Sequence, residues 1–276
     1  MGAGTGTAAR ALIATQSENG APTSNTNQAA RNDSLLGSIS TAAAWSGYLD
    51  INSMDSAGWT DVIDLQFVTN FRAMLLALNL NSEFVSFSEP VATGVQTISG
   101  LSGTPVAIRF ISSPGGVTPG TIVGDSRYMV GMAVNAGGTL KNGILAGGAN
   151  DLEATMMTRS YCRAGSGTSG DCIAGVSNDH LTINSRARVT QMASGQFQLT
   201  WDAVVGDGSR DYYAVVFYDG VHDIQTYMTE TDTVTDIVFS GLPSNMTPVA
   251  GMTFSADLAA ASTAGVLDVK DEWLMG

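Results

Sequence analysis

Positively charged side chains are scarce in this sequence. Its 276 residues contain 12 Lys and Arg against 25 Asp and Glu, a formal net charge of −13. Nucleic acids and anionic membrane surfaces attract clustered cations, so the composition argues against both as partners. The lysines, Lys141 and Lys270, do not follow a glycine-rich phosphate loop, which excludes a Walker-type NTPase. No apolar run approaches the roughly 18 residues of a membrane span, so we expect no membrane insertion.

Histidine is nearly absent as well, with His180 and His222 alone. A His-rich zinc site is therefore excluded, and one histidine beside two cysteines does not have zinc spacing. Asp202, Asp207 and Asp211 could approach one another around a hairpin and bind Ca²⁺ weakly, although Asp and Gly at these positions also suit ordinary turns. We predict no metal site and no cofactor.

The sequence has two cysteines, Cys162 and Cys172, on either side of a Gly- and Ser-rich loop. A hairpin would bring them close enough for a disulfide, which would stabilise the fold by about 2–3 kcal/mol. Two buried thiols fit the sequence equally well. Both alternatives stay open at this point.

Helical periodicity is almost missing, and what replaces it is a β pattern. From about residue 58 to 254, runs of Val, Ile, Leu, Phe and Tyr last four to nine residues, and clusters of Gly, Pro, Asn, Asp and Ser separate them. Strands without intervening helices favour an antiparallel arrangement. The sequence therefore predicts an all-β, jelly-roll-like antiparallel sandwich.

Short segments recur in the same order. WTDVI at 59–63 resembles WDAVV at 201–205, and FRAMLL at 71–76 resembles YYAVVF at 212–217. SGL and PVA follow in each half, at 99–101 and 105–107 and again at 240–242 and 248–250. Such self-similarity predicts an internal duplication and two related sandwich units.

Three divisions of the chain follow from this pattern. Residues 1–38 have few large apolar side chains and are predicted to form an extended N-terminal arm, either loose or ordered against a neighbouring subunit. Residues 84–218 are predicted to form a central sandwich, and 39–83 with 219–276 a composite one. The unique stretch 111–200, rich in loops, is where we expect specific function.

One constellation resembles a catalytic site. Gly124-Asp125-Ser126 and the later Gly-Ala-Asn150-Asp151 are similar to blocks of SGNH-type hydrolases, in which the serine attacks and the asparagine helps hold the oxyanion. The pattern departs from that family because Ser177 stands where an Asp should precede His180, and because the blocks lie too close together. We predict turns here and no catalytic residue, and keep an esterase using Ser126 as the second alternative.

Tryptophan side chains can stack on sugar rings, and the chain has four of them, Trp45, Trp59, Trp201 and Trp273. Trp59 and Trp201 occupy equivalent repeat positions, which favours core packing. Glycan contacts therefore stay unknown, and a glycan-binding adhesin is the first alternative function.

Several of these short segments also support a resemblance to a known family. SGL at 99–101 leads into PVAIRF at 105–110, and QFQLTW at 196–201 and YYAVV at 212–216 come later. Together, over about residues 90–218, they resemble a β-sandwich module of tailed-phage virion proteins, found in head fibres or spikes, decoration proteins, tail components and phage-derived gene transfer agents. The resemblance implies no catalytic residues.

The resemblance implies a virion structural protein that is not an enzyme: a head spike, capsid decoration or fibre component. Its implied partners are further copies of itself, other virion proteins such as capsid or fibre subunits, and a host surface polysaccharide during attachment. Its implied location is the surface of a particle whose proteins are made in the bacterial cytoplasm.

Overall fold

The computed structural model describes residues 2–6, 9–17, 25–55, 58–68, 80–112, 119–149, 151, 158–177, 182–206, 210–220, 222–224, 254–256, 268–269 and 273–275. Strands account for almost all regular structure in this part of the chain, which contains no α-helix and one 3₁₀ turn, η1 (Gly167–Ser169). Every strand pair is antiparallel. The predicted all-β sandwich class is confirmed.

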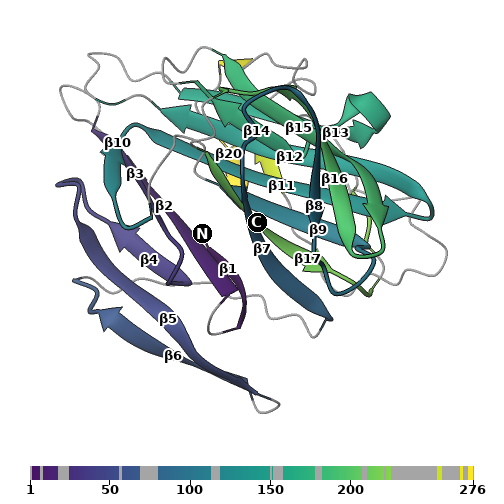
Figure 1. Cartoon of the computed structure of the whole chain (residues 1–276). Helices are drawn as coiled ribbons and strands as arrows, with labels where there is room; N and C mark the ends of the chain where they lie inside the picture. Colours follow the sequence, from purple (N-terminus) through teal and green to yellow (C-terminus); the bar gives the residue numbers. More distant parts are fainter. Residues whose placement is uncertain are drawn as a thin grey trace, which may run out of the picture.

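A seven-stranded sheet, called here the central sheet, runs through the middle of the molecule (Figure 1). Its strands come from distant parts of the chain, so their sequence order says little about their spatial order. In spatial order they are β19 (Asp268–Val269), β13 (Thr158–Ser166), β12 (Thr139–Ala149), β11 (Ser126–Ala136), β9 (Ala107–Ser112), β17 (Asp211–Phe217) and β7 (Ser82–Ser88).

The strongest local signal in this sheet is the β11–β12 hairpin. Ala136 pairs with Thr139 across a two-residue loop, Gly137 and Gly138, whose φ angles are 61° and 90°. Two successive positive φ angles match the twist of the flanking strands but strain any residue with a side chain. The two glycines therefore set the register of the two longest strands of the sheet.

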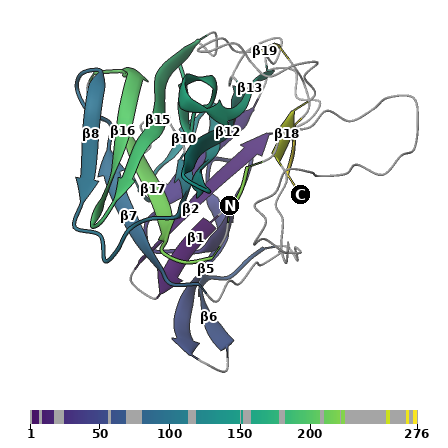
Figure 2. The ribbon, with the colours of Figure 1, turned by 90° about the vertical axis from the view of Figure 1, so that its right-hand side faces the viewer.

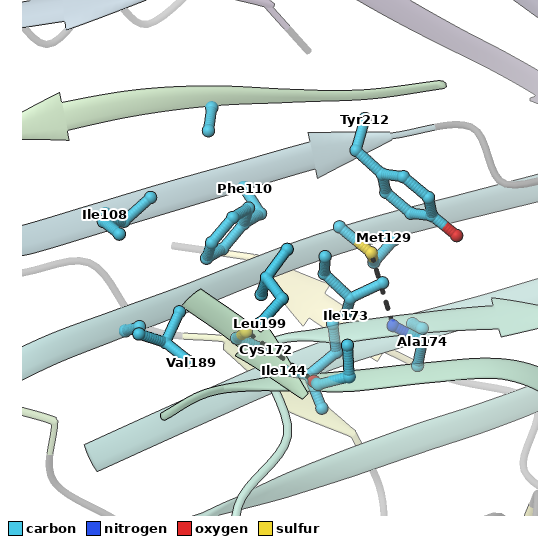
Figure 3. Close-up of a cluster of buried hydrophobic side chains, with 14 of the residues drawn as sticks. Ile108, Phe110, Met129, Ile144, Cys172, Ile173, Ala174, Val189, Leu199 and Tyr212 are labelled. Carbon is cyan, nitrogen blue, oxygen red and sulfur yellow. Dashed lines mark hydrogen bonds between the residues drawn. The ribbon is translucent and has the colours of Figure 1, made fainter. Parts of the chain in front are cut away.

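A four-stranded sheet, called here the outer sheet, covers one face of the central sheet (Figure 2). Buried aromatic rings fill the space between them: Phe110 and Phe197 have ring centroids 6.1 Å apart, and Trp201 and Tyr212 5.6 Å. Figure 3 shows Phe110 and Tyr212 of the central sheet with Leu199 of the outer one in this core. The outer sheet consists of β14 (Ile173–Val176), β15 (Ile183–Ala193), β16 (Gln196–Ala203) and β8 (Gly94–Ser99).

The opposite face of the central sheet is covered by strands from the start of the chain. Ala11 and Ile13 pack against Ile111 and Tyr213. A sheet buried on both faces needs near-continuous apolar strands, and β9, β11 and β12 have them. This N-terminal sheet contains β1 (Gly2–Gly6), β2 (Ala9–Ser17), β3 (Thr26–Arg31) and β10 (Ile122–Gly124).

The sequence pattern predicted an arm in residues 1–38 and gave no sign of these strands. Ala11 and Ala29 are fully buried although they are small: Ala11 packs with Ile111 and Tyr213 of the central sheet, and Ala29 packs with Ile39 and Ile122. The described part of 1–38 thus packs on its own chain. The rest of the domain division stays a prediction.

Two smaller sheets complete the described structure. One contains β4 (Leu36–Ile39), β5 (Trp45–Asp55) and β6 (Gly58–Leu65), and the other β18 (Phe254–Ala256) and β20 (Trp273–Met275). Of the repeated segments, 59–63 lies in β6 and 201–203 in β16. The segments at 71–76, 240–242 and 248–250 lie outside the described residues. The duplication stays a prediction.

Candidate functional site

Exposed apolar side chains gather on the segment 45–68, called here the β5–β6 hairpin. Five of the nine large hydrophobic side chains that are exposed in the described part belong to it. The exposed fractions are 51% for Met54, 42% for Val62, 59% for Ile63, 37% for Leu65 and 78% for Val68. Single exposed hydrophobics are ordinary, but a group of them on one element marks a surface that binds something.

β6 is uncovered on both of its faces. Successive side chains of a strand point to opposite faces, so Val62 and Ile63 face opposite ways, and both are exposed. Among the described strands β6 pairs with β5 alone, which makes it the edge of its sheet. The far end of the hairpin projects from the body of the molecule (Figures 1 and 2). An edge strand of this kind is a template for another strand.

The base of the hairpin is firmly held. The Asp50 carboxylate is buried and forms an ion pair with Arg10 of β2. The Arg31 guanidinium carbon lies 3.8 Å from the centroid of the Tyr48 ring, a cation–π contact. Gly47 packs against Phe67 so closely that an added Cβ would lie 2.4 Å from the ring. The base of the hairpin is therefore fixed to the rest of the chain, and its far end projects.

The charge of the hairpin is of one sign. It carries Asp50, Asp55, Asp61 and Asp64, and no Lys, Arg or His occurs between residues 45 and 68. The charge of Asp50 is neutralised by Arg10, so the remaining aspartates give the rest of the hairpin a negative charge. The hairpin thus combines exposed apolar side chains with acidic residues on one strand.

The Ser126 constellation has a visible structural role. Asp125 has a positive φ of 64°, and its carboxylate accepts hydrogen bonds from the Asp151 backbone N–H (2.9 Å) and from the Arg127 guanidinium (2.6 Å). Asp151 in turn accepts from the Thr26 backbone N–H at 2.9 Å. These contacts tie β3 to the ends of β11 and β12. Ser126 is 9% exposed, while Asn150 and His180 lie outside the described residues.

The two cysteines, both in described segments, are not joined by a disulfide. Tyr161 and Cys172 belong to the core between the central and outer sheets. Cys162 follows Tyr161 along β13, so its side chain points to the opposite face of the central sheet. Burial raises the pKa of both thiols.

We therefore expect two thiols per chain when the protein is unfolded in guanidinium without reductant and titrated with a thiol reagent. In the native protein at pH 8 the reaction should be slow, because the thiolate is the reactive form and a raised pKa lowers its fraction. The variant Cys162→Ser is the control and should give one thiol. A count of zero for the unmodified chain would contradict this arrangement.

The other predicted positions are placed as follows. Asp202 forms ion pairs with Arg188 and Arg186, and Asp211 accepts a hydrogen bond from the Ser88 hydroxyl at 2.7 Å. Asp207 lies outside the described part, within which no three His, Cys, Asp or Glu side chains are grouped to hold a metal ion. The ring of His222 lies 5.4 Å from that of Phe217.

The tryptophans divide into two groups. Trp201 is 1% exposed in the core, as expected from its repeat position, and its indole N–H donates to the Gln96 side chain at 2.9 Å. Trp45 is half-buried beside Arg31, whose guanidinium carbon lies 5.5 Å from its ring centroid. The side chains of Trp59 and Trp273 are not among those the structure describes.

A cavity of about 230 Å³ lies where the N-terminal, central and three-stranded sheets meet. Burial, and then the neighbouring Cys162, raise the pKa of the Tyr128 phenol in its wall. Ligand pockets usually measure about 300–1,000 Å³, so this cavity is small for a ligand site. Its lining includes Ile13, Ala14, Gly37, Ile39, Tyr128, Val130 and Leu145.

The sequence interpretation did not identify the hairpin as a binding surface; its expectation of specific function in 111–200 stays a prediction. A signal was present. A strand with one buried face alternates apolar and polar residues, whereas Asp61, Val62, Ile63 and Asp64 do not alternate. Charge and apolar groups on both faces indicate a strand that its own chain does not cover.

Among the described residues, no helix has the length and apolar character needed to cross a membrane. Comparison of the chain with protein-family models, with curated proteins and with solved structures found no match.

Proposed function

We propose that this chain is a structural subunit of a phage-like particle, such as a head spike, decoration or fibre component, which acts by assembling with further copies of itself and with other particle proteins. The observation that carries the proposal is the β5–β6 hairpin, with Met54, Ile63 and Val68 each more than half exposed. Apolar side chains on an open strand edge promote aggregation of a protein that stays monomeric, whereas a protein that assembles buries the same surface against its partner.

Two further features support this function. The formal charge of −13 keeps a densely displayed protein soluble. The layered body gives a firm platform, because the central sheet is buried on both faces and the base of the hairpin is held by the Arg10–Asp50 ion pair. The role in a virion itself rests on the resemblance of segments within 90–218 to tailed-phage modules.

The mass of the purified chain in solution, measured by light scattering, tests the proposal. We expect a discrete oligomer whose mass falls when Ile63→Asp places a further negative charge on the acidic hairpin. Val95→Asp is the matched control, since Val95 is 64% exposed on another edge strand, β8, and its replacement should leave the mass unchanged. A monomer at every concentration contradicts assembly as the function. Stabilisation by a sugar would then favour a glycan-binding adhesin.

A further inference from the structure

We propose that β6 pairs edge to edge with β6 of a second copy of this chain, in an antiparallel ladder centred on Val62. The inference rests on the proposed function and names the partner at the hairpin. Its starting point is that β6 has a described partner on one side alone and exposed apolar side chains on both faces. A strand of a second copy offers both the hydrogen-bonding groups and the apolar contacts that this edge lacks.

Self-pairing of one strand across a two-fold axis has few registers, and charge selects among them. Opposite residues in a ladder share a face, and a two-fold axis keeps each residue on its own face, so the residue at the axis lies opposite its own copy and Val62 cannot face Ile63 of the partner subunit. An axis through Asp61 or Asp64 would place that aspartate against its own copy, and like charges directly opposite destabilise a ladder. An axis through Val62 or Ile63 avoids this conflict.

The polar residues favour the axis through Val62. It places Thr60 opposite Asp64 of the partner subunit, where the hydroxyl can donate a hydrogen bond to the carboxylate. The same axis sets one aspartate, Asp61, opposite an apolar residue, Ile63 of the partner subunit. An axis through Ile63 would set both aspartates opposite apolar residues, Asp64 opposite Val62 and Asp61 opposite Leu65 of the partner subunit. The Val62 register also brings the two Val62 side chains together on one face and leaves Ile63 to cover the other.

The size of the contact sets its strength. Seven residues of β6, from Trp59 to Leu65, form a ladder about 24 Å long at about 3.4 Å per residue. A stable interface buries about 800 Å² on each partner, from about 20–30 residues, so one strand pair is smaller than that. Free dimers should therefore be weak and concentration-dependent, and the pairing should become strong where a particle holds subunits close together.

Salt distinguishes this partner from a different protein. The hairpin carries no cation, and each copy has a formal charge of −13, so pairing of two copies brings like charges together. Raising NaCl from 50 to 500 mM shortens the screening length and should strengthen self-association by about threefold or more. A foreign partner matched to the acidic strand would be basic, and its binding would weaken over the same range.

Cross-linking tests the register directly. Directly opposite residues in an antiparallel pair have Cα atoms about 4.5–5.5 Å apart, within the range of a disulfide. Val62→Cys should therefore form a covalent dimer on mild oxidation, at least about tenfold faster than Val95→Cys on the β8 edge, because pairing raises the local thiol concentration. The unmodified chain measures the contribution of Cys162 and Cys172.

The outcomes separate the inference from the proposed function. Fast cross-linking of Val62→Cys together with stronger association at high salt supports the pairing. If Val62→Cys cross-links no faster than Val95→Cys while light scattering still shows a discrete oligomer, the pairing is overturned and the proposed function stands. A monomer at all concentrations with no preferential cross-linking overturns both. Polydisperse aggregates in place of discrete dimers also overturn the pairing.

Discussion

Replacing Glu89 with alanine is expected to lower the free energy of unfolding by about 3–5 kcal/mol, because it removes the charged acceptor of a buried polar network and leaves the donor groups around it unpaired. Glu89 is 3% exposed at the end of β7. Its carboxylate accepts hydrogen bonds from the Ser185 hydroxyl, from the Tyr212 phenol at 3.1 Å and from the Val205 backbone N–H. These groups belong to both layers of the sandwich.

Arg210 completes the network and is 4% exposed. Its guanidinium donates to the Asn184 side chain at 2.7 Å and to the Ser185 hydroxyl at 2.8 Å, so Ser185 connects the cation to the carboxylate. Burial, and then the negative charge of Glu89, raise the pKa of Tyr212, which keeps its phenol a hydrogen-bond donor. Removal of Glu89 therefore leaves the Ser185 and Tyr212 hydroxyls and the Val205 backbone N–H without their acceptor. It also removes the negative charge to which Ser185 connects the buried Arg210 cation.

Urea unfolding of the two chains measures the difference. Glu83→Ala is the matched control on the same strand, because Glu83 accepts from Ser102 near the surface, and its loss should cost about 1 kcal/mol. Glu89→Gln keeps the shape and one acceptor, so it should fall between the two. Equal losses for Glu89→Ala and Glu83→Ala would refute the role of the network.

Adding a single methyl group at Gly131 should destabilise the fold by about 3 kcal/mol or prevent folding. A Cβ on Gly131 would lie 1.8 Å from the Cys172 carbonyl oxygen, whereas ordinary contact begins near 3.4 Å. That oxygen belongs to the backbone immediately before β14, so the methyl group would have to push the central and outer sheets apart. Overpacking a dense core costs about 1–3 kcal/mol and sometimes more.

The sign of the change in stability is the test, because replacing a glycine in a strand interior with alanine normally makes the protein more stable. Gly143→Ala is the control: Gly143 lies on the neighbouring strand β12, and its Cβ would meet a movable Ile224 methyl group at 3.3 Å. We expect Gly143→Ala to stay within about 1 kcal/mol of the unmodified chain. Thermal unfolding, with soluble yield for a variant that does not fold, compares them. Similar stabilities would contradict the close approach at Gly131.

Local sequence patterns account for the fold class and for the position of many strands. Apolar runs at 106–111, 128–134 and 212–218 correspond to β9, β11 and β17, because extended conformation follows from β-branched and aromatic residues between turn signals. The paired glycines at Gly137 and Gly138 correspond to a tight turn. These features depend on neighbours in the chain, which a local pattern records.

Long-range packing sets which faces of the strands meet and which remain exposed. Ala11 is buried because the central sheet supplies the apolar surface it covers, and Ala29 is buried because Ile39 and Ile122 pack against it; neither fact is recorded in the segment around these alanines. Cys162 and Cys172 flank one loop, yet they lie on opposite sides of the central sheet, because Cys172 packs in the core with Tyr161 and Cys162, the next residue along β13, points away from that core. Glu89 becomes buried through residues about a hundred positions away. The exposure of Ile63 also depends on long-range pairing. No described strand from a distant part of the chain pairs with β6, so β6 stays at a sheet edge, and a local sequence pattern does not record this.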